Sequence, residues 1–231
     1  MRHEASTPAR STSVWRAAWA LARNSVWAHR KALGLLSLII LACMLYPTPL
    51  AEYRNDAPLH VTGAELSRLT GQPVAEVEDS LQDGMAWVEY QGRFLATAMQ
   101  VVLPLVLADK IGLVELVYVA IATTVATHGL KWVLNDLHVG DTQLGIRPNG
   151  GQNNMPSGHS AMAGSALGFV WRRYGSWHLL YLLPLLLATM ATRVLLSAHT
   201  VSAVCTGALI GAVISYVMAT PYLNPVRRNR G

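Results

Sequence analysis

The chain has 231 residues, a net charge of +5 and 52% hydrophobic residues. Only 13% of its residues are charged, about half the share in an average soluble domain, which excludes a disordered chain, a coiled coil and an ordinary soluble domain. Its two cysteines, Cys43 and Cys205, lie inside apolar runs, which argues against a disulfide framework or a cysteine metal site.

Three uncharged stretches are long enough to cross a membrane, at residues 32–51, 174–192 and 194–226. About 20 apolar residues in a helix cross a hydrocarbon core of ~30 Å. The sequence therefore predicts an all-α, polytopic membrane protein. We expect a bundle of six spanning helices, at 32–51, 88–108, 111–131, 157–171, 174–193 and 201–219.

The first 31 residues are predicted to form a cytoplasmic segment at the membrane surface. Trp15 and Trp19 share one helical face, while Arg16, Arg23 and Arg30 recur every seven residues. This pattern suits an amphipathic helix with its indoles at the headgroup level. The first apolar run lacks a small-residue cleavage site, so we expect no cleaved signal peptide.

The membrane domain is predicted to cover residues 32–220 and to contain an outer-face insertion at 52–87. Residues 52–93 carry eight of the 13 acidic residues, and Thr62 to Glu65 fits a capping box. We expect one or two short helices here, acting either as a spacer between spans or as a lid over a site.

Charge sets the expected orientation. Twelve of the 18 basic residues fall on one side of the predicted bundle, counting residues 1–31, two turns and the basic tail at 221–231. The positive-inside tendency places that side and both termini in the cytoplasm. We predict a bacterial inner-membrane protein that contacts anionic lipid, with no nucleic-acid partner and no protein partner.

Three basic residues break this trend, because Lys131, Arg147 and Arg193 fall where helices should reach the outer surface. Ionisable groups at the membrane are costly and usually functional. His199 follows the fifth predicted helix on the same face.

The fourth predicted helix opens there with Pro156, Ser157, Gly158 and His159. We expect Pro156 in the first turn and the backbone N–H groups of Ser157 and Gly158 to be available to an anion. Three cations, a helix N-terminus and two histidines suit a phosphate. Imidazole can act as nucleophile or as acid, and no acidic cluster is available for Mg²⁺, so we expect a mechanism without metal or cofactor.

These motifs resemble the type 2 phosphatidic acid phosphatase family, which shares its site with vanadium haloperoxidases. The family pattern is K-x6-R-P, P-S-G-H and S-R-x5-H-x3-D. The second piece is intact at residues 156–159, and the others match Lys131, Arg147-Pro148, Thr192-Arg193 and His199. The resemblance covers about residues 90–215.

The resemblance implies roles for these residues. His199 would be the nucleophile that forms a phosphohistidine, and His159 would protonate the leaving oxygen. The phosphate would be held by the remaining motif residues, Lys131, Arg147, Ser157, Gly158 and Arg193, with Arg193 also counted among the catalytic groups.

Two departures from the pattern are important. Fifteen residues separate Lys131 from Arg147 instead of six, so either an insertion over roughly 138–146 absorbs the excess or the Arg position falls on His138. The Asp that normally orients the nucleophile is Ala203. Its replacement is expected among Ser202, Thr206, a backbone carbonyl, Asp136 and Asp141.

By resemblance, the expected function is a lipid phosphatase at the periplasmic face, with the 1-phosphate of lipid A as the preferred substrate. Undecaprenyl pyrophosphate, phosphatidylglycerol phosphate and phosphatidate are the alternatives, as is transfer of the phosphate to another lipid. The non-enzyme alternative is a phospholipid-binding membrane protein with a decayed site, which the loss of Asp at Ala203 would favour.

Overall fold

The computed structural model describes residues 13–46, 48 and 50–222. Predictions for residues 1–12 and for the basic tail beyond 222 lie outside the described residues. The elements are α1 (Val14–Ala28), α2 (Arg30–Leu45), α3 (Ala57–Thr70), α4 (Val74–Trp87), α5 (Arg93–Val106), α6 (Lys110–Leu134), β1 (His138–Val139), β2 (Thr142–Gln143), α7 (Gly158–Tyr174), α8 (Leu179–Leu195) and α9 (Val201–Met218). Short 3-10 helices cover Leu50–Asp56 and Ser176–His178, and a π-helical turn covers Val88–Gly92.

The described residues contain three helices that are long and apolar enough to cross a membrane. These are α6, the stretch Ser176–Leu195 that includes α8, and α9. Helices α1 and α2 count as a fourth span if taken together, although they are bent by 74°. Helices also occupy the other two predicted spans, but α5 has 14 residues and α7 has 17. The chain is thus a helical membrane protein with three or four candidate spans.

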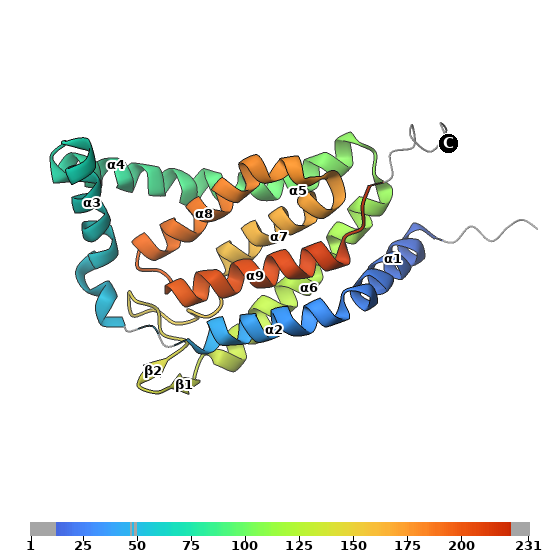
Figure 1. Ribbon diagram of the computed structural model, residues 1–231, viewed down its shortest axis with the longest axis horizontal. Coiled ribbons are helices and arrows are strands. Elements are labelled where there is room, and N and C mark those ends of the chain that lie inside the picture. The colour runs from blue at the N-terminus through green and yellow to red at the C-terminus, as the bar shows by residue number, and fades with distance from the viewer. Residues whose placement is uncertain (1–12, 47, 49, 223–231) are drawn as a thin grey trace, which may run out of the picture.

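Helix α7 lies at the centre of the bundle, with other helices on its sides (Figure 1). Its residues Ala166, Phe169 and Val170 are completely buried and form a core cluster with Val119 of α6 and Leu182 of α8. The core therefore follows α7 along its length and fixes the position of its first turn.

Glycines let α7 and α9 approach each other closely. A Cβ on Gly164 would lie 2.3 Å from the carbonyl oxygen of Ala208, and a Cβ on Gly207 would lie 2.2 Å from that of Ser157. Gly168 and Gly211 repeat this arrangement one turn along. Small residues four apart allow such backbone contact between spanning helices. This packing holds the start of α7 against the first turns of α9.

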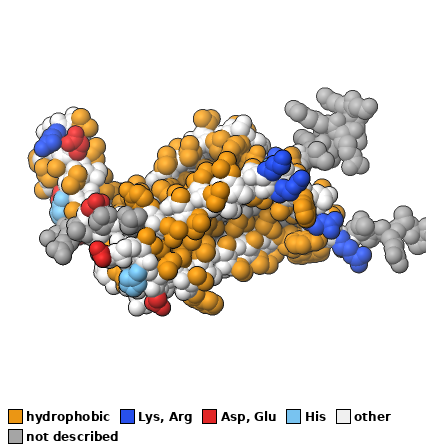
Figure 2. Space-filling view, turned by 60° about the horizontal axis from the view of Figure 1, so that its bottom comes forward, with side chains coloured by type: hydrophobic (Ala, Val, Ile, Leu, Met, Phe, Trp, Pro, Cys, Tyr) orange, Lys and Arg blue, Asp and Glu red, His pale blue; other side chains and the backbone are white. Residues whose placement is uncertain are grey.

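The outer surface of the bundle is mostly hydrophobic between its two ends (Figure 2). Leu38, Val125 and Leu180 are 64%, 66% and 81% exposed. Lys and Arg side chains gather at the end from which both tails leave, and acidic and His side chains gather at the other end. Such a surface suits contact with lipid.

Arg173 was counted among the basic residues of the predicted cytoplasmic side, but its side chain is buried. It is 5% exposed and forms hydrogen bonds with both carboxylate oxygens of Asp109, with Glu115 at 2.8 Å and with the carbonyl of Thr220 at 2.7 Å. This buried network joins the α5–α6 turn, α6, α7 and the residues after α9.

The predicted insertion at 52–87 contains two helices, α3 and α4, at the end opposite the tails (Figure 1). Helix α4 continues through the π-helical turn Val88–Gly92 into α5. In the amphipathic segment, α1 packs Trp15 and Trp19 edge-on against Tyr118 of α6, at 5.8 and 5.6 Å between ring centroids.

Candidate active site

The motif residues meet at the end of the bundle where α6 and α8 end and α7 and α9 begin (Figure 1). Lys131 lies in the last turn of α6 and Arg193 in the last turn of α8. After α8 the chain folds back, because the N–H groups of Ala198 and His199 both donate to the carbonyl of Arg193 at 3.1 Å. This turn explains the five-residue spacing between Arg193 and His199.

His199 is oriented by a main-chain oxygen. Its Nδ1 lies 2.8 Å from the carbonyl oxygen of Asn154, and the residue is 2% exposed. Because a carbonyl can only accept a hydrogen bond, Nδ1 carries the proton and Nε2 carries the lone pair. The backbone carbonyl therefore supplies the acceptor that Ala203 lacks. Asp136 and Asp141, which were candidates for this acceptor, are exposed.

Asn154 itself is held from two sides. Its side-chain amide donates to the carbonyl of Leu144 at 3.3 Å and to Oγ1 of Thr200 at 3.2 Å. Its Oδ1 accepts from the N–H of Thr200, the N-cap residue of α9, at 3.1 Å. These bonds fix the carbonyl that orients His199, and the sequence pattern contained no signal for this role.

Positive charge surrounds the nucleophile position. Burial lowers the pKa of His199, and the charges of Arg193, Arg147 and Lys131 lower it further. The three cations are therefore close enough to act on one imidazole. The Nε atoms of Arg147 and Arg193 are buried without a hydrogen-bond partner in the described part of the chain. Unpaired buried donors of this kind suit an oxyanion.

Arg147 reaches this site although the spacing from Lys131 is long. The hairpin β1–β2 takes up residues 138–143, and the N–H of Asn149 donates to the carbonyl of Ser197 at 3.0 Å. His138 lies on β1, is exposed and contacts the carbonyl of Asp136. Of the two alternatives, the structure thus favours the insertion over a shift of the Arg position to His138.

The start of α7 differs from the expectation. Ser157 is the N-cap residue and Pro156 precedes it, so Pro156 is outside the first turn. The N–H of Ser157 is not available to an anion, because it donates to the carbonyl of Ala203 at 2.9 Å. Gly158 is the first helical residue, and a Cβ there would meet nothing within 4 Å. The N–H of Ser160 donates to Oγ of Ser157, the N-cap bond, so the N–H of Gly158 is the first-turn donor that we expect an anion to use.

Glu89 is a site residue that the sequence pattern did not indicate. Its carboxylate accepts from Arg193 Nη1 at 2.8 Å and lies 3.8 Å from Nε2 of His159. It therefore bridges the predicted acid and a predicted phosphate ligand. Glu89 is on the π-helical turn, a feature often found at functional sites.

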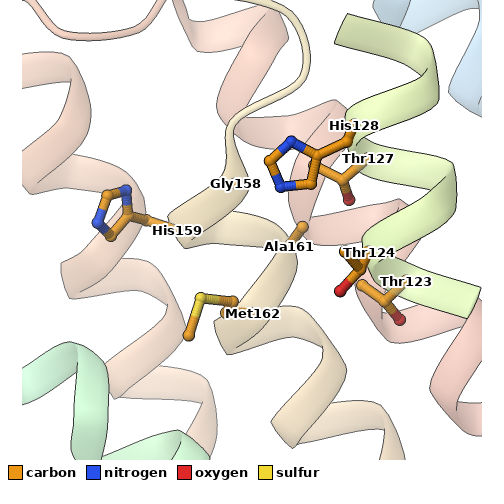
Figure 3. A pocket seen from close by; sticks show the side chains of 8 residues that line it. All are labelled: Thr123, Thr124, Thr127, His128, Gly158, His159, Ala161 and Met162. Atoms are coloured by element: carbon orange, nitrogen blue, oxygen red, sulfur yellow. The ribbon is translucent and has the colours of Figure 1, made fainter. Parts of the chain in front are cut away.

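Two cavities lie beside this bridge. One, of about 230 Å³, is lined by residues of α6 and α7, including His159 and Gly158 (Figure 3). The other, of about 410 Å³, is lined by Glu89 together with residues of α3, α4 and the end of α8. His159 therefore lines one cavity and Glu89 lines the other. Among the described residues, no cluster of His, Cys, Asp and Glu can hold a metal ion.

Comparison with known proteins matches the part of the chain that contains the motif residues. The sequence profile of the PAP2 superfamily matches residues 112–225. The lipid A 1-phosphatase of Helicobacter pylori (strain ATCC 700392 / 26695) is 42% identical over 135 residues, which are 58% of this chain and 71% of that protein. The lipid A 1-phosphatase of strain J99 / ATCC 700824 is 39% identical over 149 residues, 64% of this chain and 78% of that protein.

The lipid A 4'-phosphatase of strain J99 / ATCC 700824 is 33% identical over 121 residues, covering 51% of this chain and 61% of that protein. No solved structure matches the chain significantly.

Proposed function

Since this chain belongs to the PAP2 superfamily, we propose that it hydrolyses the 1-phosphate of lipid A in a bacterial inner membrane. The observation that carries this proposal is the buried imidazole of His199, which the Asn154 carbonyl holds beside Lys131, Arg147 and Arg193. The Nε atoms of the two arginines have no hydrogen-bond partner among the described residues. The names of the most similar relatives above supply the substrate. The 1-position is preferred over the 4'-position because both 1-phosphatases are more similar to this chain.

The proposed chemistry uses the two histidines on opposite sides of the phosphorus. Nε2 of His199 attacks, the bond to the leaving oxygen breaks, and His159 gives that oxygen its proton. Water then attacks the phosphohistidine, and His159 takes its proton, which restores both imidazoles and releases phosphate. Arg147, Arg193 and Lys131 stabilise the charge on the phosphoryl oxygens.

The proposed orientation keeps six helices in the membrane and places both termini in the cytoplasm. The gathering of Lys and Arg at the tail end (Figure 2) supports this. The active site then faces the periplasm at headgroup level, so a lipid can present its phosphate while its tails stay in the bilayer.

The test is phosphate release by purified protein in detergent, with a chelator present and lipid A as substrate. We expect release from the 1-position, identified by mass spectrometry of the product. His199→Ala and His159→Ala should each lower kcat by at least about 10²-fold, the low end for a proton-transfer group. His138→Ala, which changes an exposed histidine on the hairpin, is the matched control.

Other outcomes separate the alternatives. If phosphate is released from undecaprenyl pyrophosphate or phosphatidylglycerol phosphate but not from lipid A, the hydrolysed lipid is the substrate and lipid A is not. Loss of the 1-phosphate with its appearance on an added lipid would make the protein a phosphotransferase. Full turnover in both histidine variants would exclude the mechanism.

A further inference from the structure

One face of α6 is polar although the helix is apolar enough to cross a membrane. Thr123, Thr127 and Lys131 recur every four residues, so they lie on one side of the helix. They are only 6%, 4% and 9% exposed. Thr124 and His128 lie beside them and are exposed. Lys131 has a part in the proposed mechanism, but these threonines and His128 have none.

Thr123, Thr124, Thr127 and His128 line the cavity of about 230 Å³ between α6 and α7 (Figure 3). On the α7 side, the lining residues include Gly158 and His159, the residues beside the proposed reaction centre. His128 extends from α6 towards the start of α7 in this view. The cavity thus shares Gly158 and His159 with the proposed active site.

The hydroxyls of Thr123 and Thr127 are buried within α6, a candidate membrane span. Both Oγ1 atoms are buried and have no hydrogen-bond partner in the described part of the chain. On α8, by contrast, Thr189 Oγ1 donates to the carbonyl of Leu185 at 2.8 Å. A buried hydroxyl without a partner is costly, and at membrane depth little water is available to satisfy it. A helical Thr has two χ1 rotamers, so its hydroxyl can turn towards a ligand.

The depth of the cavity indicates its occupant. With a rise of ~1.5 Å per residue, Thr127 and Thr123 lie about 6 and 12 Å along α6 from Lys131, towards the middle of the bilayer. When a lipid phosphate is bound near Lys131, this depth is occupied by the groups that join the headgroup to the acyl chains. In lipid A and other acyl lipids these groups are hydroxyls, amides and esters, which can pair with Thr and His side chains.

We propose that this cavity is a second binding site for the substrate, which recognises its hydroxyl, amide or ester linkage groups through Thr123, Thr124, Thr127 and His128. The inference rests on the proposed lipid phosphatase function and adds a basis for specificity. A site built to hydrogen-bond such groups rejects analogues that lack them. The protein therefore prefers acylated lipid phosphates to phosphates carried on a plain hydrocarbon chain.

The experiment compares two substrates in the same detergent: lipid A, and a long-chain alkyl phosphate that has a phosphate and a tail but no linkage group. Thr123→Val, Thr127→Val, Thr124→Val and His128→Ala are assayed one at a time. We expect each to lower kcat/KM for lipid A by about three- to tenfold, the equivalent of one hydrogen bond. The value for the alkyl phosphate should stay within about twofold.

Thr189→Val is the matched control, because it removes a hydroxyl that is already bonded within its own helix. It should leave the ratio of the two kcat/KM values unchanged. If the alkyl phosphate is not turned over, its inhibition constant against lipid A replaces its kcat/KM. Thr124 and His128 are exposed, so their variants test the proposal even where a buried variant fails to fold.

Two failures are distinguishable. If the wild-type protein releases phosphate from lipid A and all four variants keep the wild-type ratio, the second site is wrong and the lipid phosphatase function stands. If the wild-type protein releases no phosphate from lipid A, both the function and the second site are overturned.

Discussion

His199 is buried beside three positive charges, and this environment has a consequence for the pH dependence of the reaction. Burial and the cations lower the pKa of His199, so its imidazole is neutral at pH values where a free histidine, with a pKa of about 6.5, is protonated. Because the nucleophile must be neutral, we expect the acid limb of kcat/KM to lie below that value. A pH profile of kcat/KM reports the free enzyme and measures this directly. An acid limb above pH ~7 would contradict the environment described.

Ala203 cannot simply be restored to Asp. The residue is completely buried in a cluster with Leu134, Leu144 and Met155, and the Asn154 carbonyl already occupies the acceptor position at His199. A carboxylate there would be a buried charge without an ion-pair partner in that apolar cluster, which is costly. We expect Ala203→Asp to lower both the melting temperature in detergent and the activity, whereas Ala203→Ser should be milder. Wild-type stability and rate in Ala203→Asp would mean that the carbonyl is dispensable.

Glu89 is expected to position the acid. Its carboxylate lies 3.8 Å from Nε2 of His159 and accepts from Nη1 of Arg193 at 2.8 Å, so it holds the ring beside the proposed phosphate site. Arg193 of α8 and His128 of α6, which lines the same cavity, also face this region. Glu89→Gln keeps the size of the side chain but removes its charge, so we expect kcat for phosphate release to fall by about tenfold, the equivalent of one charge-assisted hydrogen bond. Glu78→Gln, which changes the half-buried carboxylate paired with the exposed His60, is the control. An unchanged kcat in Glu89→Gln would limit Glu89 to a structural role.

The sequence predicted the charged members of the site because each carries a visible signal. Lys131, Arg147 and Arg193 are cations predicted to lie on the outer face, against the charge trend, and the histidines lie in motifs. The Asn154 carbonyl has no such signal, because every residue has one. Glu89 was missed because it lies 104 residues from its partner Arg193, within a segment interpreted as the start of a span.

At the scale of elements, the close contact of α7 and α9 holds both histidines in place. A Cβ on Gly207 would lie 2.2 Å from the carbonyl oxygen of Ser157, so Gly207→Ala must push the start of α7 away from α9. We expect a loss of roughly 1–3 kcal/mol in stability together with reduced kcat. Thermal unfolding in detergent and phosphate release measure the two effects.

Gly129→Ala is the matched control for this change, because Gly129 lies in α6 and a Cβ there meets nothing within 4 Å. It should keep or slightly raise stability, since Ala is the better helix former. Equal effects of the two substitutions would show that helix propensity, and not the approach of α7 to α9, decides the outcome.

The sequence placed a helix at each of the six predicted positions but predicted only some of the ends. The range 201–219 matches α9 to within one residue, and the start at 157 is one residue from that of α7. The range 32–51 does not match α2, which begins at Arg30 after a sharp bend and ends at Leu45. The π-helical turn before α5 and the hairpin at 138–143 depend on tertiary contacts. Short local patterns carry little information about such features.

At the scale of the whole molecule, the buried Arg173 network ties together segments far apart in the chain. Burial alone would raise the pKa of Asp109, but its bonds to Arg173 outweigh this and hold the pKa below its ordinary value. A carboxylate with a lowered pKa stabilises the fold above its unfolded pKa, about 3.9, and loses this contribution as pH falls through the folded value. We therefore expect stability to fall on acidification below pH ~4.

The substitution that tests this network is Asp109→Asn. Removing one partner of a buried pair costs roughly 3–5 kcal/mol, so the melting temperature at pH 7 should fall and its dependence on acid should weaken. Glu65→Gln changes an exposed pair with Arg68 and should have little effect. If both variants melt like the wild type, the network does not hold the bundle together.

The bond from His199 to the main chain at residue 154 has a consequence for mutagenesis. No amino-acid exchange can delete a peptide oxygen, so an alanine scan will not reveal the group that aims the nucleophile. A substitution at Asn154 removes only the side-chain amide bonds to Leu144 and Thr200 that fix this segment. The orientation of the His199 imidazole therefore depends on the path of the backbone at residue 154. It should tolerate side-chain substitutions but not an insertion that displaces the loop before α7.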